Sequence, residues 1–296
     1  MAERIIDSNG IRLWTEEFGD RRNPTLLLVM GASAQGIQWP EAFIQPFVDK
    51  GFHVIRFDNR DTGQSSCFDF AKQPYNLNDL AADAIGVLDA YDVPAAHVAG
   101  ASMGGMITQT LMIQQPKRVR SATIIMSSPL AGSVDGVPML RADDLAGPDP
   151  EWLGEMMQLQ MSMPTSTPAE LIDMRVAMFT KLAGRLPVDT AGLRDIATRE
   201  VGRAINFAAQ ANHSLAIGAS SPNDRRPLLR KTSIPTLVIH GTDDPILPYP
   251  HGKALADAIP GAKLLTIDGM GHDLPVQVWP QTVSYTHLTL PTICSV

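Results

Sequence analysis

The stretch Gly100-Ala101-Ser102-Met103-Gly104-Gly105 decides the fold. It follows an apolar run at residues 95–99 and opens a helical pattern at residues 103–115. A strand, a sharp turn and a helix are therefore expected, with Ser102 at the apex, where a strained backbone lifts its hydroxyl clear of the sheet. Gly100 and Gly104 suit this turn because a Cβ at either position would clash with the neighbouring strand or helix.

The segments on either side of this turn alternate between strand-like and helix-like patterns. After a predicted N-terminal hairpin at residues 3–7 and 11–18, helical patterns occupy 40–50, 78–91 and 252–259. Apolar runs typical of buried strands occupy residues 25–30, 53–57, 119–126, 236–240 and 263–267. This alternation predicts an α/β fold with a mostly parallel, doubly wound sheet.

Residues 130–232 differ in character from the segments before and after them. They carry helical patterns at 151–163, 169–182 and 193–217, separated by prolines, and no strong strand pattern. We interpret them as a helical cap inserted into the sheet domain. The predicted core is then divided between residues 1–129 and 233–282.

Three polar residues lie just beyond three predicted strands, in the order Ser102, Asp244, His272. In open α/β sheets, ligands bind outside the carboxyl ends of the strands. A serine needs a base to take its proton, a histidine can do so near neutral pH, and a carboxylate orients the imidazole. We therefore predict that these residues form a catalytic triad. Asp244 is preferred to Asp243 because it directly precedes Pro245, in a Gly-x-x-Asp-Pro turn at a strand end.

An oxyanion formed at Ser102 would need two hydrogen-bond donors. One is expected from the backbone N–H of Met103, and the other from the small-residue loop after the strand at 25–30, at the N–H of Ala32. No metal-ligand, dinucleotide or phosphate-loop motif is found, so no cofactor or metal is expected. A polar loop at residues 58–65 is interpreted as structural, with Arg60 tying neighbouring loops and Gly63 permitting a turn.

Composition restricts the possible partners. The 296 residues are 44% apolar and 19% charged, with a net charge of −7, so no basic patch is expected for nucleic acid. No apolar run is long enough for a membrane span or a signal peptide, and a reducing cytoplasm is the default expectation with Cys67 unpaired. These exclusions favour a small-molecule partner.

At these residues the chain resembles the α/β-hydrolase family, from Glu3 to Pro275. The resemblance rests on the Ser102 turn, the 58–65 loop, the Asp244-Pro245 turn and Gly269-x-Gly271-His272. Within the family, residues 26–31, 39–40, 61–63, 80–84 and 251–253 are similar to small methylesterases that act on anthracycline-type (aclacinomycin-type) polyketides. The resemblance implies a serine carboxylic-ester hydrolase with a helical cap, whose expected partner is a small-molecule ester substrate.

The sequence departs from this family at three places. Most relatives have His-Gly at the oxyanion loop, where this chain has Met30-Gly31, so this loop must be held by other groups. Many relatives have glycine at the position of Asp61. Residues 283–292 resemble a translated sequencing adapter, so we expect native sequence to stop near Gln281 or Thr282. The tail 283–296, with Cys294, would then be non-native and the final helix largely missing.

The cap suggests the kind of substrate. It is rich in methionine, which is flexible and suits an irregular apolar pocket, although ordinary helix packing explains each residue equally well: Met139, Met156, Met157, Met161, Met163, Met174 and Met178. Other uses of the same triad stay open, namely hydrolysis of lactones, amides, thioesters or carbon–carbon bonds, and perhydrolysis. A hydrolase-fold receptor with little turnover is a further alternative. A nucleophilic aspartate is disfavoured because serine occupies the turn.

Overall fold

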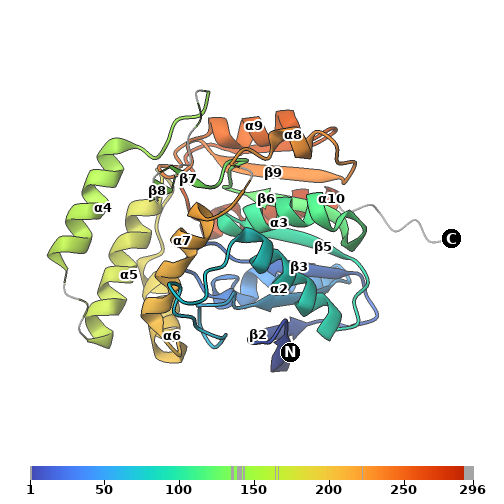
Figure 1. Cartoon of the computed structure of the whole chain (residues 1–296). Helices are drawn as coiled ribbons and strands as arrows, with labels where there is room; N and C mark the ends of the chain where they lie inside the picture. Colours follow the sequence, from blue (N-terminus) through green and yellow to red (C-terminus); the bar gives the residue numbers. More distant parts are fainter. Residues whose placement is uncertain are drawn as a thin grey trace.

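One twisted sheet of eight strands organises the protein (Figure 1). The computed structural model describes residues 2–134, 137–138, 142, 144–163, 165, 167–221 and 223–289. In chain order the strands are β1 (Ala2–Ser8), β2 (Ile11–Phe18), β3 (Thr25–Val29), β4 (His53–Phe57), β5 (Ala96–Ala101), β6 (Val119–Ile125), β9 (Thr236–Gly241) and β10 (Lys263–Ile267).

The sheet order is β1-β2-β4-β3-β5-β6-β9-β10. Strands β3, β4, β5, β6, β9 and β10 run parallel, whereas β2 pairs antiparallel with both β1 and β4. The β1–β2 turn has positive φ at both Asn9 and Gly10, as a tight hairpin requires. The predicted mostly parallel, doubly wound sheet is therefore confirmed.

Helices cover both faces of the sheet because side chains along each strand alternate between them. Leu27 and Val98 belong to the core beneath α2 (Leu77–Ala90), α3 (Met103–Gln114), α8 (Arg226–Leu229) and α9 (Pro250–Ala258). Leu26 and Ala99 belong to the core beneath α1 (Glu41–Asp49) and α10 (Trp279–Thr289). Both cores are built from nearly fully buried side chains, which provides the main stabilisation of such a fold.

The inserted segment between β6 and β9 is mainly helical. Ahead of α8, its helices are α4 (Pro150–Ser162), α5 (Pro168–Leu182), α6 (Thr190–Arg203) and α7 (Asn212–Gly218), of which α4, α5 and α6 stand side by side at one end of the strands (Figure 1). Prolines occupy the first positions of α4 and α5, where a missing N–H costs nothing, and Thr167 with Glu170 forms a capping box for α5. Short 3-10 turns complete the chain at η1 (Gly36–Gln38), η2 (Pro116–Arg118), η3 (Phe207–Ala211) and η4 (Val276–Val278).

Two expectations for the inserted segment are wrong. Residues 193–217 do not form one helix, because the chain turns extended at Ala204 and Asn206 caps η3 through the N–H of Ala208. The N–H of Ile205 donates to the carbonyl of Gly63, so a contact with the core competes with helix continuation. The segment also contains a small hairpin, β7 (Ser133–Val134) and β8 (Val137–Pro138), which the pattern did not indicate.

The expectation that the final helix would be largely missing is also wrong. Residues 279–289 form α10, in which Thr282, Val283 and Thr286 are buried. Trp279 meets Phe43 of α1 edge-on, with ring centroids 5.8 Å apart. The adapter origin of residues 283–296 stays a prediction, and Cys294 lies outside the described residues. Among the helices that the structure describes, none is both long and apolar enough to cross a membrane.

Candidate active site

The turn after β5 presents Ser102 at its apex. Ser102 has φ +54° and ψ −118°, a conformation that L-residues rarely adopt. A Cβ on Gly100 would lie 2.1 Å from the carbonyl oxygen of Gly104, and one on Gly104 would lie 2.1 Å from that of Val29. The strained turn therefore depends on glycine at both predicted positions.

Ser102, His272 and Asp244 form a continuous hydrogen-bonded chain. Ser102 Oγ lies 2.9 Å from His272 Nε2, and His272 Nδ1 lies 2.8 Å from Asp244 Oδ2. Because the carboxylate accepts, Nδ1 carries the proton, and Nε2 is free to accept from the serine hydroxyl. The three residues lie in the loops after β5, β9 and β10. These strands run parallel, so their carboxyl ends lie at the same edge of the sheet. The structure thus brings all three predicted residues together.

Asp244 is well suited to remain a carboxylate. Its second oxygen accepts hydrogen bonds from the backbone N–H groups of Ile246 and Leu247, at 3.0 and 2.8 Å. Burial alone would raise the pKa of Asp244, but the adjacent His272 and His240 outweigh it and hold that pKa below its ordinary value. By contrast, Asp243 pairs with exposed Arg185 at the surface and does not reach the histidine.

His240, at the end of β9, belongs to this cluster although the sequence reading gave it no role. Its Nε2 donates to the carbonyl of Leu247 at 2.7 Å and lies 3.4 Å from Asp244 Oδ2. It therefore helps to fix the turn that carries the acid. Its position four residues before Asp244, where the strand ends, was the only available signal.

The inserted segment directly supports the loop that carries His272. The backbone N–H of His272 donates to the carbonyl of Leu182, the last residue of α5, at 2.8 Å. The N–H of Leu186 donates to the carbonyl of Gly269 at 3.3 Å. The position of His272 thus depends on both the sheet and the cap.

Two backbone N–H groups near Ser102 are the predicted oxyanion donors. In the described part of the chain, neither Met103 N–H nor Ala32 N–H donates to a protein acceptor. Met103 begins α3, where helix N–H groups have no partner within the helix. A Cβ on Gly31 would lie 3.1 Å from Ser102 Cβ, so the loop carrying Ala32 runs beside the serine.

A cavity of ≈ 330 Å³ adjoins His272. Its walls come from the core and from the cap helices α5 and α6, and are mainly apolar: Met30, Ile37, Trp39, Ala101, Met126, Phe179, Val188, Leu193, Ile196, Leu274 and Trp279 among them. Of the methionines named in the sequence analysis, none that the structure describes lines this cavity. Met156 and Met174 are buried by helix packing, and Met139 lies outside the described residues. The cavity suits an apolar group, but its apolar walls are provided by residues other than these methionines.

Asp273 is a partly buried polar residue that lines the same cavity, next to His272. Its Oδ1 is buried without a hydrogen-bond partner. Burial raises the pKa of Asp273 to about 6, against the opposing effect of neighbouring His272. A carboxyl that changes charge near neutrality therefore stands beside the histidine, and the sequence reading did not single it out.

The loop at residues 58–65 has the structural role that its sequence indicated. Arg60 forms a two-pronged ion pair with Asp83 of α2, at 2.6 and 2.7 Å. Gly63 has φ +55°, and a Cβ there would lie 2.0 Å from Asp58 Oδ2. Asp58 in turn accepts from the N–H of Gly36, at 2.8 Å, in the loop that follows β3.

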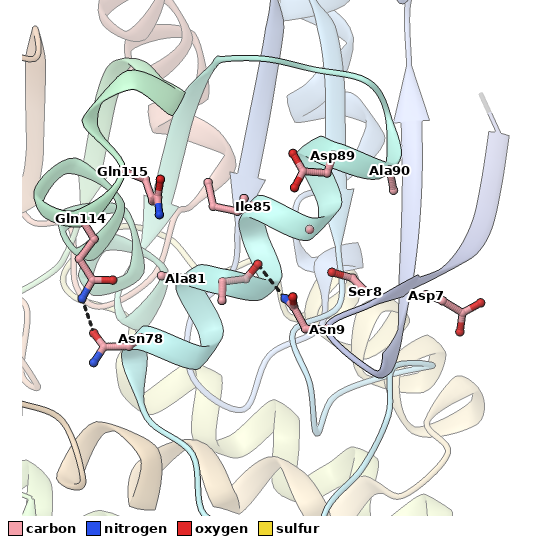
Figure 2. Close-up of a pocket in the computed structure, with 12 residues that line it drawn as sticks. Asp7, Ser8, Asn9, Asn78, Ala81, Ile85, Asp89, Ala90, Gln114 and Gln115 are labelled. Atoms are coloured by element: carbon pink, nitrogen blue, oxygen red, sulfur yellow. Dashed lines mark hydrogen bonds between the residues drawn. The ribbon is translucent and has the colours of Figure 1, made fainter.

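A second cavity, of ≈ 290 Å³, lies against α2 and the β1–β2 turn (Figure 2). Its polar groups pair with one another, as Asn9 does with the carbonyl of Ala82 and Gln114 with Asn78. Gln114 is the last residue of α3, and the first residue of α3 directly follows Ser102. The rise along this helix alone therefore separates Gln114 from the serine turn by about 17 Å. This cavity is no part of the serine site.

The comparisons with known proteins agree with this arrangement. A family model described as the alpha/beta hydrolase fold matches residues 24–277. The chain belongs to the α/β-hydrolase fold family. Rhodomycin D methylesterases of Streptomyces sp. strain C5 and Streptomyces peucetius are each 36% identical to this α/β-hydrolase over 287 residues, with 94% of either chain covered. The predicted resemblance to methylesterases of this kind is confirmed.

Solved structures share the fold of this α/β-hydrolase. An esterase from Rhodococcus sp. ECU1013 has a TM-score of 0.77 at 21% identity, over 99% of this chain and 100% of the esterase. An enol-lactonase from Burkholderia xenovorans LB400 has a TM-score of 0.68 at 23% identity, over 96% and 97%. At such identities the likeness concerns the fold alone.

Proposed function

We propose that this α/β-hydrolase is a serine esterase that cleaves methyl esters of bulky, apolar, polycyclic compounds. The observation that carries the proposal is the hydrogen-bonded chain from Ser102 through His272 to Asp244, beside an apolar cavity. The two rhodomycin D methylesterases support the class of substrate. The cavity supports it too, because apolar walls favour apolar groups.

The proposed reaction gives each of these residues one role. His272 Nε2 takes the proton of Ser102 as its Oγ attacks the ester carbonyl, and Asp244 stabilises the imidazolium that forms. The oxyanion of the tetrahedral intermediate accepts from the N–H groups of Met103 and Ala32. His272 then gives its proton to the leaving methoxide, releasing methanol. Water, deprotonated by the same nitrogen, hydrolyses the acyl-enzyme.

The direct test measures ester hydrolysis by the wild-type protein and by Ser102→Ala. The panel contains p-nitrophenyl esters of increasing acyl length, small methyl esters, polycyclic methyl esters and a lactone. We expect Ser102→Ala to lose at least ~10⁴-fold in kcat, because no other group can attack from the turn. We expect polycyclic methyl esters to show the highest kcat/KM. Equal turnover by both proteins would refute the assignment of Ser102.

Asp244 and Asp243 provide a matched pair within one turn. We expect Asp244→Asn to lower kcat on the order of 10³–10⁴-fold, because the amide no longer holds the required histidine tautomer. Asp243→Asn loses a surface ion pair with Arg185, while an amide oxygen can still accept from Thr242 Oγ1, and the variant is expected to stay within about threefold of wild type. The reverse result would assign the acid to Asp243.

A further inference from the structure

The loop after β3 carries Ala32, whose N–H is the second of the two proposed oxyanion donors. Its sequence is Met30-Gly31-Ala32-Ser33, and Ser33 has φ +57°, in the left-handed region that is uncommon for residues other than glycine. A conformation of this kind persists only where the surrounding structure enforces it. The groups that contact Ser33 therefore decide where the preceding N–H of Ala32 points.

Those groups come from the cap. Ser33 N–H donates to His213 Nδ1 at 3.0 Å, and Ser33 Oγ donates to the carbonyl of Gln210 at 2.9 Å. His213 lies in α7 and Gln210 in η3, about 180 residues further along the chain. The cap therefore holds both hydrogen-bond donors of Ser33, its N–H and its hydroxyl.

His213 is itself fixed in one tautomer and one orientation. Its Nε2 lies 2.7 Å from the carbonyl of Arg60, which can only accept, so the proton is on Nε2 and Nδ1 is free to accept. The ring is fully buried. Burial lowers the pKa of His213, against the carbonyl of Arg60 and the charge of Asp61, while the charge of Arg60 lowers it further. The neutral form is the one that this arrangement requires.

We propose that His213 is a positioning residue, which aligns the Ala32 N–H with the oxyanion by holding Ser33 from the cap. This proposal rests on the proposed esterase function. The rest of the loop is anchored independently, since Asn59 Nδ2 donates to the Met30 carbonyl at 3.1 Å and Gly36 N–H donates to Asp58. Loss of His213 should therefore free the segment around Ala32 and Ser33 without unfolding the sheet.

The test compares His213→Phe, His213→Leu and His213→Asn with the wild type. His213→Phe removes the acceptor and is expected to lower kcat about 10²-fold, the usual effect of losing one oxyanion donor. KM should stay within threefold, because the loop acts on the transition state rather than on substrate binding. His213→Asn keeps an acceptor near the position of Nδ1, and about tenfold of the loss should be recovered.

A second measurement separates alignment from general loosening of the fold. A trifluoromethyl ketone forms a tetrahedral adduct with Ser102 and uses the oxyanion donors, whereas the product acid does not need them. We expect His213→Phe to weaken the ketone about 10²-fold and the product acid less than threefold. His97→Phe is the control, because His97 is also buried but lies at the start of β5, roughly 16 Å of strand from Ser102.

The outcomes are distinguishable. If His213→Phe folds and keeps kcat and ketone affinity within threefold, while Ser102→Ala is inactive, the His213 proposal is wrong and the esterase function stands. If His213→Phe fails to fold, His213→Leu decides, because its smaller side chain also lacks an acceptor for the Ser33 N–H, and a kcat within threefold of wild type would overturn the proposal. If Ser102→Ala is as active as wild type, the esterase function itself fails.

Discussion

Asp273 shows how a single residue can combine a cost in stability with a place at the site. Its carboxyl has a buried oxygen without a partner, directly after the histidine that contacts Ser102. Proteins seldom leave such groups unpaired, because the desolvation cost is not repaid. The side chain therefore opposes folding whenever it is charged.

We expect Asp273→Asn to stabilise the protein above pH 6. The pKa of Asp273 is raised to about 6 from an ordinary value of 3.8. Below pH 4 both the folded and the unfolded states hold the proton, and between 4 and 6 only the folded state does, so stability falls as pH rises through this window. At pH 7.5 the variant should gain on the order of 1–2 kcal/mol in free energy of unfolding.

Urea unfolding at pH 7.5 and at pH 5.0 measures this effect, with Asp195→Asn, an exposed residue on the same cavity, as control. The gain from Asp273→Asn should shrink at pH 5.0, and the control should stay near zero at both values. A gain that is independent of pH would contradict the explanation.

The sequence was most informative about residues whose role is local. The sequence pointed to Ser102 with its glycines, to the Asp-Pro turn and to His272. Each of them lies within a few residues of the end of a predicted strand. His213 was not identifiable in this way, since its partner Ser33 lies 180 residues away and meets it only when the inserted segment packs on the core. His240 was not either, although Asp244 and Leu247 are close in sequence, because only the folded turn brings them to its ring. Asp273 gave no signal because burial, not residue type, makes it unusual.

At the scale of elements, α10 is the helix that the sequence predicted least well. Its residues lack helical periodicity and contain three threonines, so local propensity gave little reason to expect it. It forms in the structure because Trp279 and Val283 pack into the core beneath α1. Tertiary packing therefore outweighs local preference here.

Val283→Ala tests the importance of this packing. The side chain is 4% exposed, and removing two methyl groups should cost about 1–2 kcal/mol of unfolding free energy. Ser284→Ala, at the next and exposed position, should stay within about 0.5 kcal/mol. Chemical denaturation of both variants measures the difference. Equal stability would mean that α10 does not dock on the sheet.

The opposite case is the segment at residues 193–217, whose local pattern predicted a single helix. Continuous helical propensity could not reveal that Ile205 is bonded to Gly63 of the core. The break separates α6, which lines the cavity, from α7, which carries His213. Boundaries set by such distant contacts cannot be obtained from local sequence.

For the whole molecule, the main question is what joins the cap to the core. Glu200 of α6 is buried at the centre of this junction. It pairs with Arg175 of α5 at 2.8 Å, and it accepts from Gln35 N–H and Gln38 Nε2 in the loop after β3. One carboxylate thus connects two cap helices to the segment that continues from Ser33.

We expect Arg175 and Glu200 to be strongly coupled. Arg175→Met or Glu200→Gln alone leaves a buried charge without its partner and should cost about 3 kcal/mol each. The double variant should cost about 2 kcal/mol less than the sum. A double-mutant cycle by urea unfolding measures the coupling.

The control cycle uses Arg194 and Asp173, which join the same two helices at the exposed surface with a distance of 2.7 Å. Arg194→Met and Asp173→Asn should couple by less than about 0.5 kcal/mol. Additive costs for the buried pair would show that the junction depends on packing alone.

The bond from His272 N–H to the carbonyl of Leu182 has a consequence for engineering chimaeras. Exchanging caps between relatives is an attractive route to new substrates, because the insertion enters and leaves the sheet at two points. A donor cap, however, would also bring its own version of the main-chain acceptor that supports the histidine. A successful graft therefore has to preserve the end of α5 as part of the recipient, and the portable unit is smaller than the insertion itself.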